Sequence, residues 1–185
     1  MDRRDKPGDD GGGWGAGIVT PPHVLPDVLA PGLRIVFCGT AAGSESARQQ
    51  AYYAHPQNRF WRALHEAGLT PRLLKPAEYP LMPSFGLGLT DIAKHVSGMD
   101  RELPAGALGR DPCALLRAKI ELYAPRILAF TSLTAGRRFL ARQNVRFGEQ
   151  PERIGDTRLW ALPSPSPTAG WNWDPAPWKA LADAA

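Results

Sequence analysis

The sequence predicts a three-layer α/β/α fold with a central, mainly parallel β-sheet. An apolar run over residues 33–38 has the length of a buried strand and leads into a loop bounded by two glycines, which is typical of the carboxyl edge of a parallel sheet. Further along the chain, helical patterns alternate with short apolar strands, the order that crossover connections require. Together these patterns favour an open α/β sheet with helices on both faces.

Each later element follows from its own local signals. Residues 69–88 contain four prolines among apolar residues and are expected to form loop with a short helix. The Asp111-Pro112 pair is typical of a helix start. In chain order, we expect a helix over 58–67, a helix from 111 to about 123, a strand over 126–130, a helix over 134–142, a strand over 158–162 and a helix over 177–184.

The chain has 185 residues, which suits one domain with a substantial core. Residues 1–22 combine charges with a run of glycines and are expected to form a flexible tail, leaving residues 23–185 as the single domain. The tail lacks the apolar centre of a signal peptide, and no later segment is apolar for long enough to cross a membrane. We therefore expect a cytoplasmic protein.

The composition predicts a nucleic-acid partner and no bound cofactor. The formal net charge of +4 suits a polyanion. Only two cysteines are present, Cys38 and Cys113, too few for a disulfide framework or a four-cysteine cluster, and the histidines lack zinc-ligand spacing. The glycine loop matches neither the dinucleotide fingerprint nor the phosphate loop. No metal and no cofactor are expected.

Two motifs carry a resemblance to a known family. The first is the strand with its loop, Gly39-Thr40-Ala41-Ala42-Gly43, and the second is the block Tyr53-Ala54-His55-Pro56-Gln57-Asn58-Arg59-Phe60-Trp61. Over residues 25 to about 162 the chain resembles the uracil-DNA glycosylase superfamily, in particular the mismatch-specific uracil- and thymine-DNA glycosylase branch. Its aromatic block also resembles that of the hypoxanthine-DNA glycosylase branch.

The resemblance implies that the glycine loop, from Gly39 to Gly43, lines the substrate pocket. It also implies that Tyr53 stacks on a base rotated out of the DNA, and His55 is expected to hold the loop rather than transfer protons. Packing of Tyr53 on the core is the structural alternative. The loop departs from the mismatch-specific branch at Ala41, where that branch carries the Asn that positions the attacking water.

Asp91 and Asn58 are the catalytic candidates. Asp91 follows a second short apolar run, where other members of the superfamily carry an Asn that reads the base edge. Asn58 is the nearest amide able to replace the missing loop Asn, and an Asn is the catalytic residue proposed in the hypoxanthine branch. Each residue has a structural alternative as a helix N-cap, Asp91 before residues 92–94 and Asn58 before residues 59–67.

The segment after the last predicted strand matches the second motif of the superfamily and is expected to contact DNA. Its candidate residues are Ser164, Ser166, Pro167, Thr168 and Ala169, which can hold phosphates and form a small wedge. Ser164 stands where most branches carry His or Asn. Without the family, such a Ser/Pro repeat indicates a rigid loop.

The sequence therefore predicts a monomeric, monofunctional DNA glycosylase. It would excise uracil, with hypoxanthine as a second substrate, from DNA that contains a deaminated base, and leave an abasic site. No lysine in the matched motifs offers a Schiff base. A hypoxanthine-specific glycosylase and a damaged-DNA-binding protein without catalysis are the alternatives. Four arginines at 137, 138, 142 and 146 suit phosphate contacts, although a solvated basic face is the commoner explanation of such a pattern.

Overall fold

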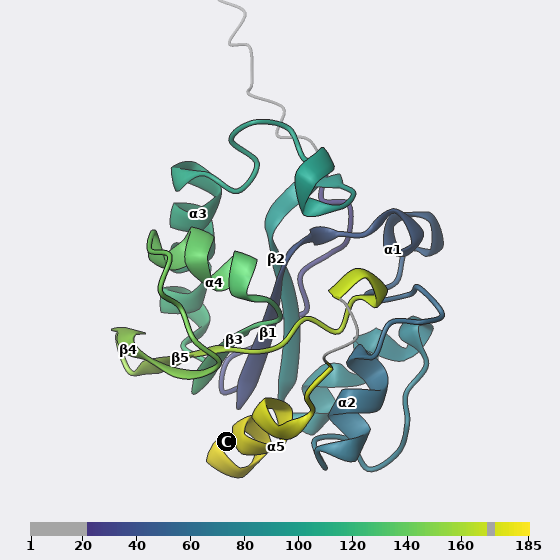
Figure 1. The fold of residues 1–185 in the computed structure, drawn as a ribbon. Helices are drawn as coiled ribbons and strands as arrows, with labels where there is room; N and C mark the ends of the chain where they lie inside the picture. Colours follow the sequence, from purple (N-terminus) through teal and green to yellow (C-terminus); the bar gives the residue numbers. More distant parts are fainter. Residues whose placement is uncertain (1–21, 170–172) are drawn as a thin grey trace, which may run out of the picture.

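The computed structural model describes residues 22–169 and 173–185, and a five-stranded sheet runs through its centre (Figure 1). The strand order is β2-β1-β3-β5-β4, in which β4 is antiparallel to β5 and the other neighbours are parallel. The predicted α/β fold with a mainly parallel sheet is confirmed. The strands are β1 (Ile35–Ala42), β2 (Leu87–Ser97), β3 (Ile127–Phe130), β4 (Gly148–Ile154) and β5 (Thr157–Ala161).

The central strand β1 is apolar on both faces because helices cover both. Ile35 and Phe37 pack into one buried cluster, whereas Val36 and Cys38 pack into the other. This alternation follows from the two-residue period of a strand, and burial on both faces explains the continuous apolar run in the sequence.

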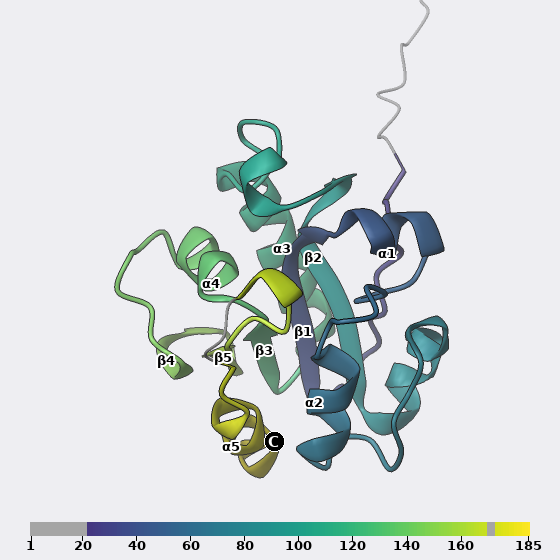
Figure 2. The same ribbon diagram turned by 45° about the vertical axis from the view of Figure 1, so that its right-hand side comes forward.

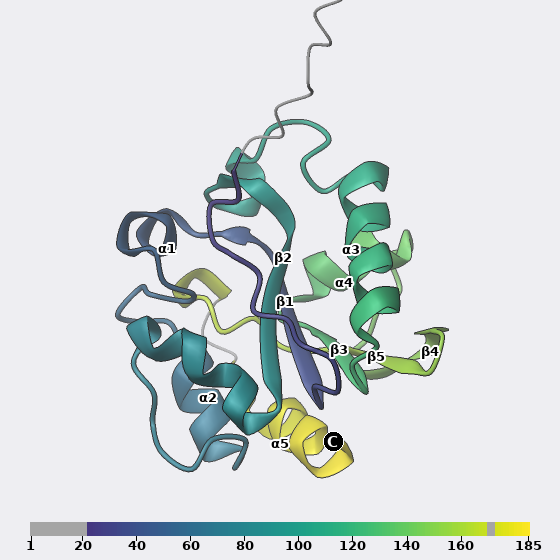
Figure 3. The same ribbon diagram turned by 180° about the vertical axis from the view of Figure 1, so that it is seen from behind.

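The helices divide between the two faces (Figure 3). One face is covered by α3 and α4 and the other by α1, α2, α5 and the 3₁₀ segment η1. The helical bounds are α1 (Ser44–Gln49), α2 (Phe60–Glu66), η1 (Pro76–Phe85), η2 (Asp100–Glu102), α3 (Arg110–Tyr123), α4 (Leu133–Leu140), η3 (Pro167–Ala169) and α5 (Ala176–Ala184).

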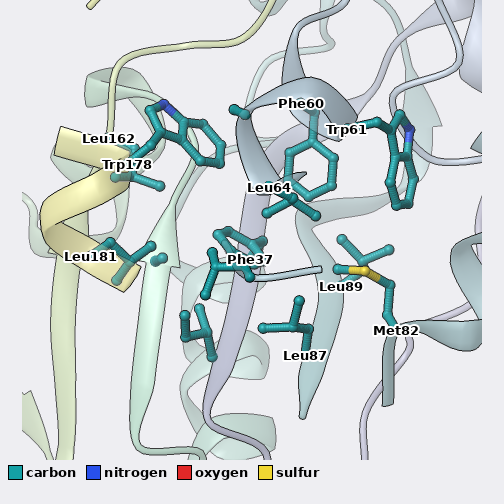
Figure 4. Packing of buried hydrophobic residues seen from close by; sticks show 14 of the residues in the cluster. Phe37, Phe60, Trp61, Leu64, Met82, Leu87, Leu89, Leu162, Trp178 and Leu181 are labelled. Carbon is teal, nitrogen blue, oxygen red and sulfur yellow. The ribbon is translucent and has the colours of Figure 1, made fainter. Parts of the chain in front are cut away.

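Aromatic rings join α2 and α5 to the sheet (Figure 4). Phe37 of β1 meets Phe60 edge to face at 5.3 Å and stacks on Trp178 at 5.9 Å between ring centroids. Each of these rings is almost completely buried. Large buried aromatic residues contribute heavily to core stability, so this cluster holds the start of α2 firmly above the sheet.

The structure corrects several predicted boundaries. The stretch from Gly39 to Ala42, predicted as loop, continues β1, where Ala41 pairs with Ala93 of β2. Helix α2 begins at Phe60 rather than at residue 58. The first helix, α1, and the antiparallel edge strand β4 were not predicted. Glycine and alanine have low strand propensity, so only the parallel pairing with β2 makes residues 39–42 a strand.

The segment before β1 covers the outer edge of β2. Val28 forms an antiparallel bridge with Leu89, and the backbone N–H of Val24 donates to the carbonyl of Lys94 at 2.7 Å. The edge strand thus gains backbone partners that it would otherwise lack. Of the predicted N-terminal tail, residues 1–21 lie outside the described residues. Among the helices described, none has both the length and the apolar character needed to span a bilayer.

Candidate active site

Gly39 and Asp91 lie opposite each other at the point where β1 and β2 approach the carboxyl edge of the sheet. A methyl group built on Gly39 would stand 2.7 Å from Asp91 Oδ1, 3.5 Å from the Tyr53 hydroxyl and 3.7 Å from Thr131 Oγ1. The absence of a side chain at Gly39 therefore lets three oxygen-bearing side chains converge. Ligands of open α/β sheets bind at this edge.

Tyr53 is held at this point by contacts on its ring and its hydroxyl. The ring stacks on Phe60 with 3.8 Å between centroids and planes inclined by 16°. The hydroxyl shares a 3.1 Å hydrogen bond with Thr131 Oγ1. Its backbone has φ of +52°, a left-handed conformation that is costly for a bulky residue and often marks functional sites. Burial, reinforced by the Asp91 charge, raises the pKa of Tyr53, so the hydroxyl stays protonated.

Asp91 is a buried carboxylate, with 5 % of its surface exposed. Burial raises the pKa of Asp91, and the Lys94 ammonium, whose Nζ lies 3.6 Å from Asp91 Oδ2, partly opposes that rise. A charge held in a low-dielectric site interacts strongly with charge that develops nearby. The alternative of Asp91 as a helix N-cap is wrong, because residues 92–94 continue β2.

Lys94 links Asp91 to a second carboxylate, Asp27. The Lys94 ammonium donates to the Tyr52 hydroxyl at 2.9 Å and lies 3.1 Å from Asp27 Oδ1. Asp27 also accepts hydrogen bonds from Thr90 and from Lys119 of α3. Burial by itself would raise the pKa of Asp27, but Lys94 and these two donors outweigh it, and the pKa is lowered. A buried charge with several partners is expensive to disturb, so the network holds Lys94 beside Asp91.

The other predicted substrate-binding residues occupy different surroundings. Thr40 turns its hydroxyl to Asp100, at 2.5 Å. Ala42 is buried in the core, and Gly43 precedes α1 with open space where a side chain would stand. His55 is exposed, and its Nδ1 accepts a hydrogen bond from the backbone N–H of Gln57 at 3.1 Å. The imidazole thus stabilises the turn that follows Tyr53.

Asn58 has a structural partner. Its Oδ1 accepts a hydrogen bond from the backbone N–H of Phe60 at 2.9 Å, which satisfies a free donor at the start of α2. This geometry favours the capping role of Asn58 over a role in catalysis, because its side-chain oxygen is already directed at the Phe60 N–H. Asn58 still contributes indirectly, since α2 carries Phe60 beneath Tyr53.

The predicted DNA-binding residues form a compact loop that ends in η3. The Ser164 hydroxyl accepts from the backbone N–H of Ser166, and the Ser166 hydroxyl bonds Thr168 Oγ1 at 2.9 Å. In Figures 1 and 2, η3, which spans Pro167–Ala169, lies beside the end of β1, between α1 and α4. The loop therefore borders the same sheet edge as Tyr53 and Asp91.

A small pocket of about 200 Å³ opens between this loop and the start of α2. Arg59 forms part of its wall: its backbone N–H donates to the Pro165 carbonyl at 2.9 Å, and its guanidinium lies 5.6 Å from the Trp173 ring centre. Within the described chain, Arg59 Nη1 is buried without a hydrogen-bond partner. Such a donor can bind an anion or a carbonyl oxygen. The pocket is lined by Arg59, Leu133, Phe147, Pro163, Ser164, Ala169 and Trp173.

Three members of the site, Thr131, Lys94 and Asp27, were not predicted from the sequence. Thr131 directly follows β3, and a polar residue at the end of a parallel strand is a recognisable signal. Lys94 lies three residues after Asp91 in an apolar strand, a second available signal. Asp27 had no recognisable signal in the sequence, because only the folded chain brings it next to β2. No group of three His, Cys, Asp or Glu side chains suited to a metal occurs among the residues described.

The chain matches known proteins in its sequence family and in its fold. The family model of the uracil DNA glycosylase superfamily matches residues 26–183. The fold is also similar to the solution NMR structure of a protein from Methanosarcina acetivorans described as a "putative Uracil DNA glycosylase", with 20 % sequence identity and a TM-score of 0.55. That match covers 85 % of this chain and 94 % of the other.

Proposed function

The chain belongs to the uracil DNA glycosylase superfamily, and from this premise we propose that it is a monofunctional DNA glycosylase that removes uracil from DNA. Hypoxanthine, which is also a deaminated base, is proposed as a second substrate. The observation that carries the proposal is the convergence of the Asp91 carboxylate and the Tyr53 hydroxyl over Gly39 at the carboxyl edge of the sheet.

The proposed reaction is hydrolysis of the N-glycosidic bond. Water adds to C1′ of the sugar, the bond from C1′ to the base nitrogen breaks, and the base leaves with the bonding electrons. The water loses a proton and the base gains one, so the products are the free base and an abasic sugar. Positive charge develops on the sugar in the transition state, and a negative group held nearby lowers the barrier.

Asp91 is the group proposed to supply that negative charge. The residue corresponding to the usual loop Asn is Ala41, whose methyl group cannot orient water. Asp91 reaches the space above Gly39 from the neighbouring strand instead. An ionised carboxylate there both stabilises the cationic sugar and accepts the proton of the attacking water. Lys94 acts as a positioning residue that favours the ionised form.

Tyr53 is proposed to stack on the flipped base through the ring face turned away from Phe60. Base–aromatic stacking contributes about 1–3 kcal/mol with little base preference. The Ser164–Ala169 loop is proposed to contact the DNA backbone. A lyase step is not proposed: Lys94 is buried and its ammonium is bound to Tyr52 and Asp27, so the amine cannot reach the sugar.

A damaged-DNA-binding protein without catalysis is the second candidate. Two substitutions favour it: Ala41 stands in place of the loop Asn, and Ser164 stands in place of the His or Asn of the second motif. If Asp91 does not act on the sugar, the remaining site would still stack a base and hold phosphates. This protein would bind uracil-containing or abasic DNA without releasing the base.

A single-turnover excision assay separates the two candidates. Excess protein is incubated with labelled oligonucleotides that carry one uracil or one hypoxanthine, single-stranded and duplex, and alkali then cleaves any abasic site. Cleavage at uracil supports the proposal. Cleavage only at hypoxanthine would mean that the protein is a hypoxanthine-specific glycosylase. Retained binding without cleavage at either base supports the non-catalytic candidate.

A further inference from the structure

A second cavity lies between α3 and α4, outside the cluster of residues around Gly39. It has a volume of about 950 Å³ and shares no residue with the cluster around Gly39. We call it the α3–α4 groove. Its walls are Leu108, Gly109, Arg110, Cys113, Ala114, Arg117, Ala118, Glu121, Thr134, Arg137, Arg138, Phe139, Ala141 and Gln143.

The charge of the α3–α4 groove is strongly positive. Four arginines line it, at positions 110, 117, 137 and 138, against a single carboxylate, Glu121. In the described part of the chain, no acidic side chain lies within ion-pair distance of Arg110, Arg117 or Arg138. Some arginines outside the groove are neutralised, as where Arg142 pairs with Glu152 at 2.8 Å. The groove therefore holds positive charge that the protein itself does not neutralise.

One aromatic contact and the spacing along α3 fix where two of the groove's arginines lie. The Arg117 guanidinium lies 5.0 Å from the centre of the Phe139 ring, so an aromatic contact between α3 and α4 restrains it. Arg110 and Arg117 are seven residues apart on α3, which separates them by about 10 Å along the helix. That separation lets the two guanidinium groups contact different phosphates of one DNA strand.

The α3–α4 groove begins close to the candidate active site. Thr131, which bonds Tyr53, is followed by Ser132, whose side chain caps α4, and Thr134 already lines the groove. A DNA strand that leaves the site past this turn would meet the arginines next. We propose that the α3–α4 groove binds the phosphodiester backbone of DNA flanking the target nucleotide. This inference rests on the proposed function for its choice of DNA as the polyanion.

The test measures binding of undamaged DNA, so it does not depend on excision. Fluorescence anisotropy with a labelled single-stranded oligonucleotide, at several salt concentrations, compares the wild type with Arg117→Gln/Arg138→Gln. The expected result is an affinity at least fivefold lower at low salt. The slope of log affinity against log salt should become shallower by about 0.7 for each phosphate that the variant no longer neutralises.

Arg62→Gln/Arg126→Gln is the matched control, because it also removes two exposed arginine charges, neither residue appears in an ion pair among the described residues and neither lines the groove. Its affinity should stay within twofold of the wild type. Equal reductions in both double variants, or no reduction in either, would overturn the proposal. Arg117→Lys/Arg138→Lys, which keeps both charges, should retain most of the affinity even if the glutamine variant is unstable, and a complete loss of binding there would contradict electrostatic binding.

Excision is measured separately on uracil DNA with saturating protein. The Arg117→Gln/Arg138→Gln variant should need a higher protein concentration than the wild type to reach that saturation. Absence of excision in the wild type, with the difference in DNA binding retained, would refute the proposed function and leave the groove assignment standing.

Discussion

Gly39 and Asp91 form a pair in which one residue lacks a side chain so that the other can occupy its place. They are direct neighbours in the parallel pairing of β1 and β2, and Asp91 Oδ1 lies 2.7 Å from the position of a Cβ atom on Gly39. Real Cβ atoms do not approach an oxygen so closely. A side chain at position 39 must therefore displace the carboxylate.

Gly39→Ala should lower both stability and excision. Overpacking of a buried site costs about 1–3 kcal/mol, and displacement of the Asp91 carboxylate removes it from the reacting centre. Urea denaturation and single-turnover excision measure the two effects. Gly43→Ala is the control, since Gly43 has φ of −67° and open space around it. If Gly39→Ala behaves like Gly43→Ala in both measurements, the close approach is not functional.

Asp91→Asn should lower single-turnover excision by about tenfold or more, the loss expected when a group acting in the transition state is removed. The substitution keeps the shape of the side chain and removes its charge. Asp156→Asn, in the exposed turn between β4 and β5, provides a control for the loss of one negative charge. A rate for Asp91→Asn equal to that of the control would remove Asp91 from the proposed mechanism.

Part of the candidate site could be predicted from the sequence, and part could not. Gly39, Tyr53 and Asp91 were singled out from their motifs, and the structure brings them together because parallel strands end at one edge of a sheet. Whether any of them acts in catalysis stays a prediction. Asp27 was missed because its pairing with Lys94 depends on the segment that covers the edge of β2, a long-range contact without a local signal.

The fold class was predicted correctly, whereas the boundaries of several helices and strands were not. The apolar strands and the amphipathic helices carry strong periodic signals. Strand β4 escaped prediction because its sequence, Gly-Glu-Gln-Pro-Glu-Arg-Ile, is polar and contains a proline, and only its pairing with β5 at the sheet edge makes it a strand. The extension of β1 through Ala42 likewise depends on a neighbouring strand.

The excision rate should depend on pH through Asp91. Burial raises the pKa of this carboxyl and Lys94 opposes the rise, so the rate should increase with pH through a midpoint above the ordinary range of aspartate. Lys94→Met removes the opposing charge, and the midpoint should move to higher pH. Single-turnover rates at constant ionic strength measure both profiles. An unshifted midpoint would show that Lys94 does not influence the titrating group.

The raised pKa of Asp91 also makes the stability of the folded protein depend on pH. Because the pKa of Asp91 is raised in the folded state, its stabilising contribution is complete below the unfolded pKa and is lost as pH rises through the folded value. The Asp91→Asn variant has no titrating carboxyl at this position, so its stability does not fall in this way as pH rises. The stability of Asp91→Asn relative to wild type should therefore increase with pH across that window, as measured by urea denaturation.

Asn58→Ala should act mainly on stability. Loss of the hydrogen bond from the Phe60 N–H to Asn58 Oδ1 should cost about 1 kcal/mol, the usual effect of removing a helix cap. Asn58→Asp retains an acceptor and should restore the melting temperature. If Asn58→Ala instead loses tenfold or more in excision rate while its melting temperature is unchanged, Asn58 is a catalytic residue and the capping role is secondary.

Ala41→Asn tests whether Asp91 has replaced the amide that the strand β1 lacks. Ala41 pairs with Ala93 two positions beyond Gly39, so an asparagine there would project from the same face of β1 as the space that Asp91 Oδ1 fills. If the site has room for both groups, Ala41→Asn should leave single-turnover excision unchanged or raise it. Ala41→Asn should also restore measurable excision to Asp91→Asn, because the new amide can position the attacking water. A lower rate in Ala41→Asn alone, with an unchanged melting temperature, would mean that the added side chain blocks the pocket and that Ala41 is required for the substrate to enter.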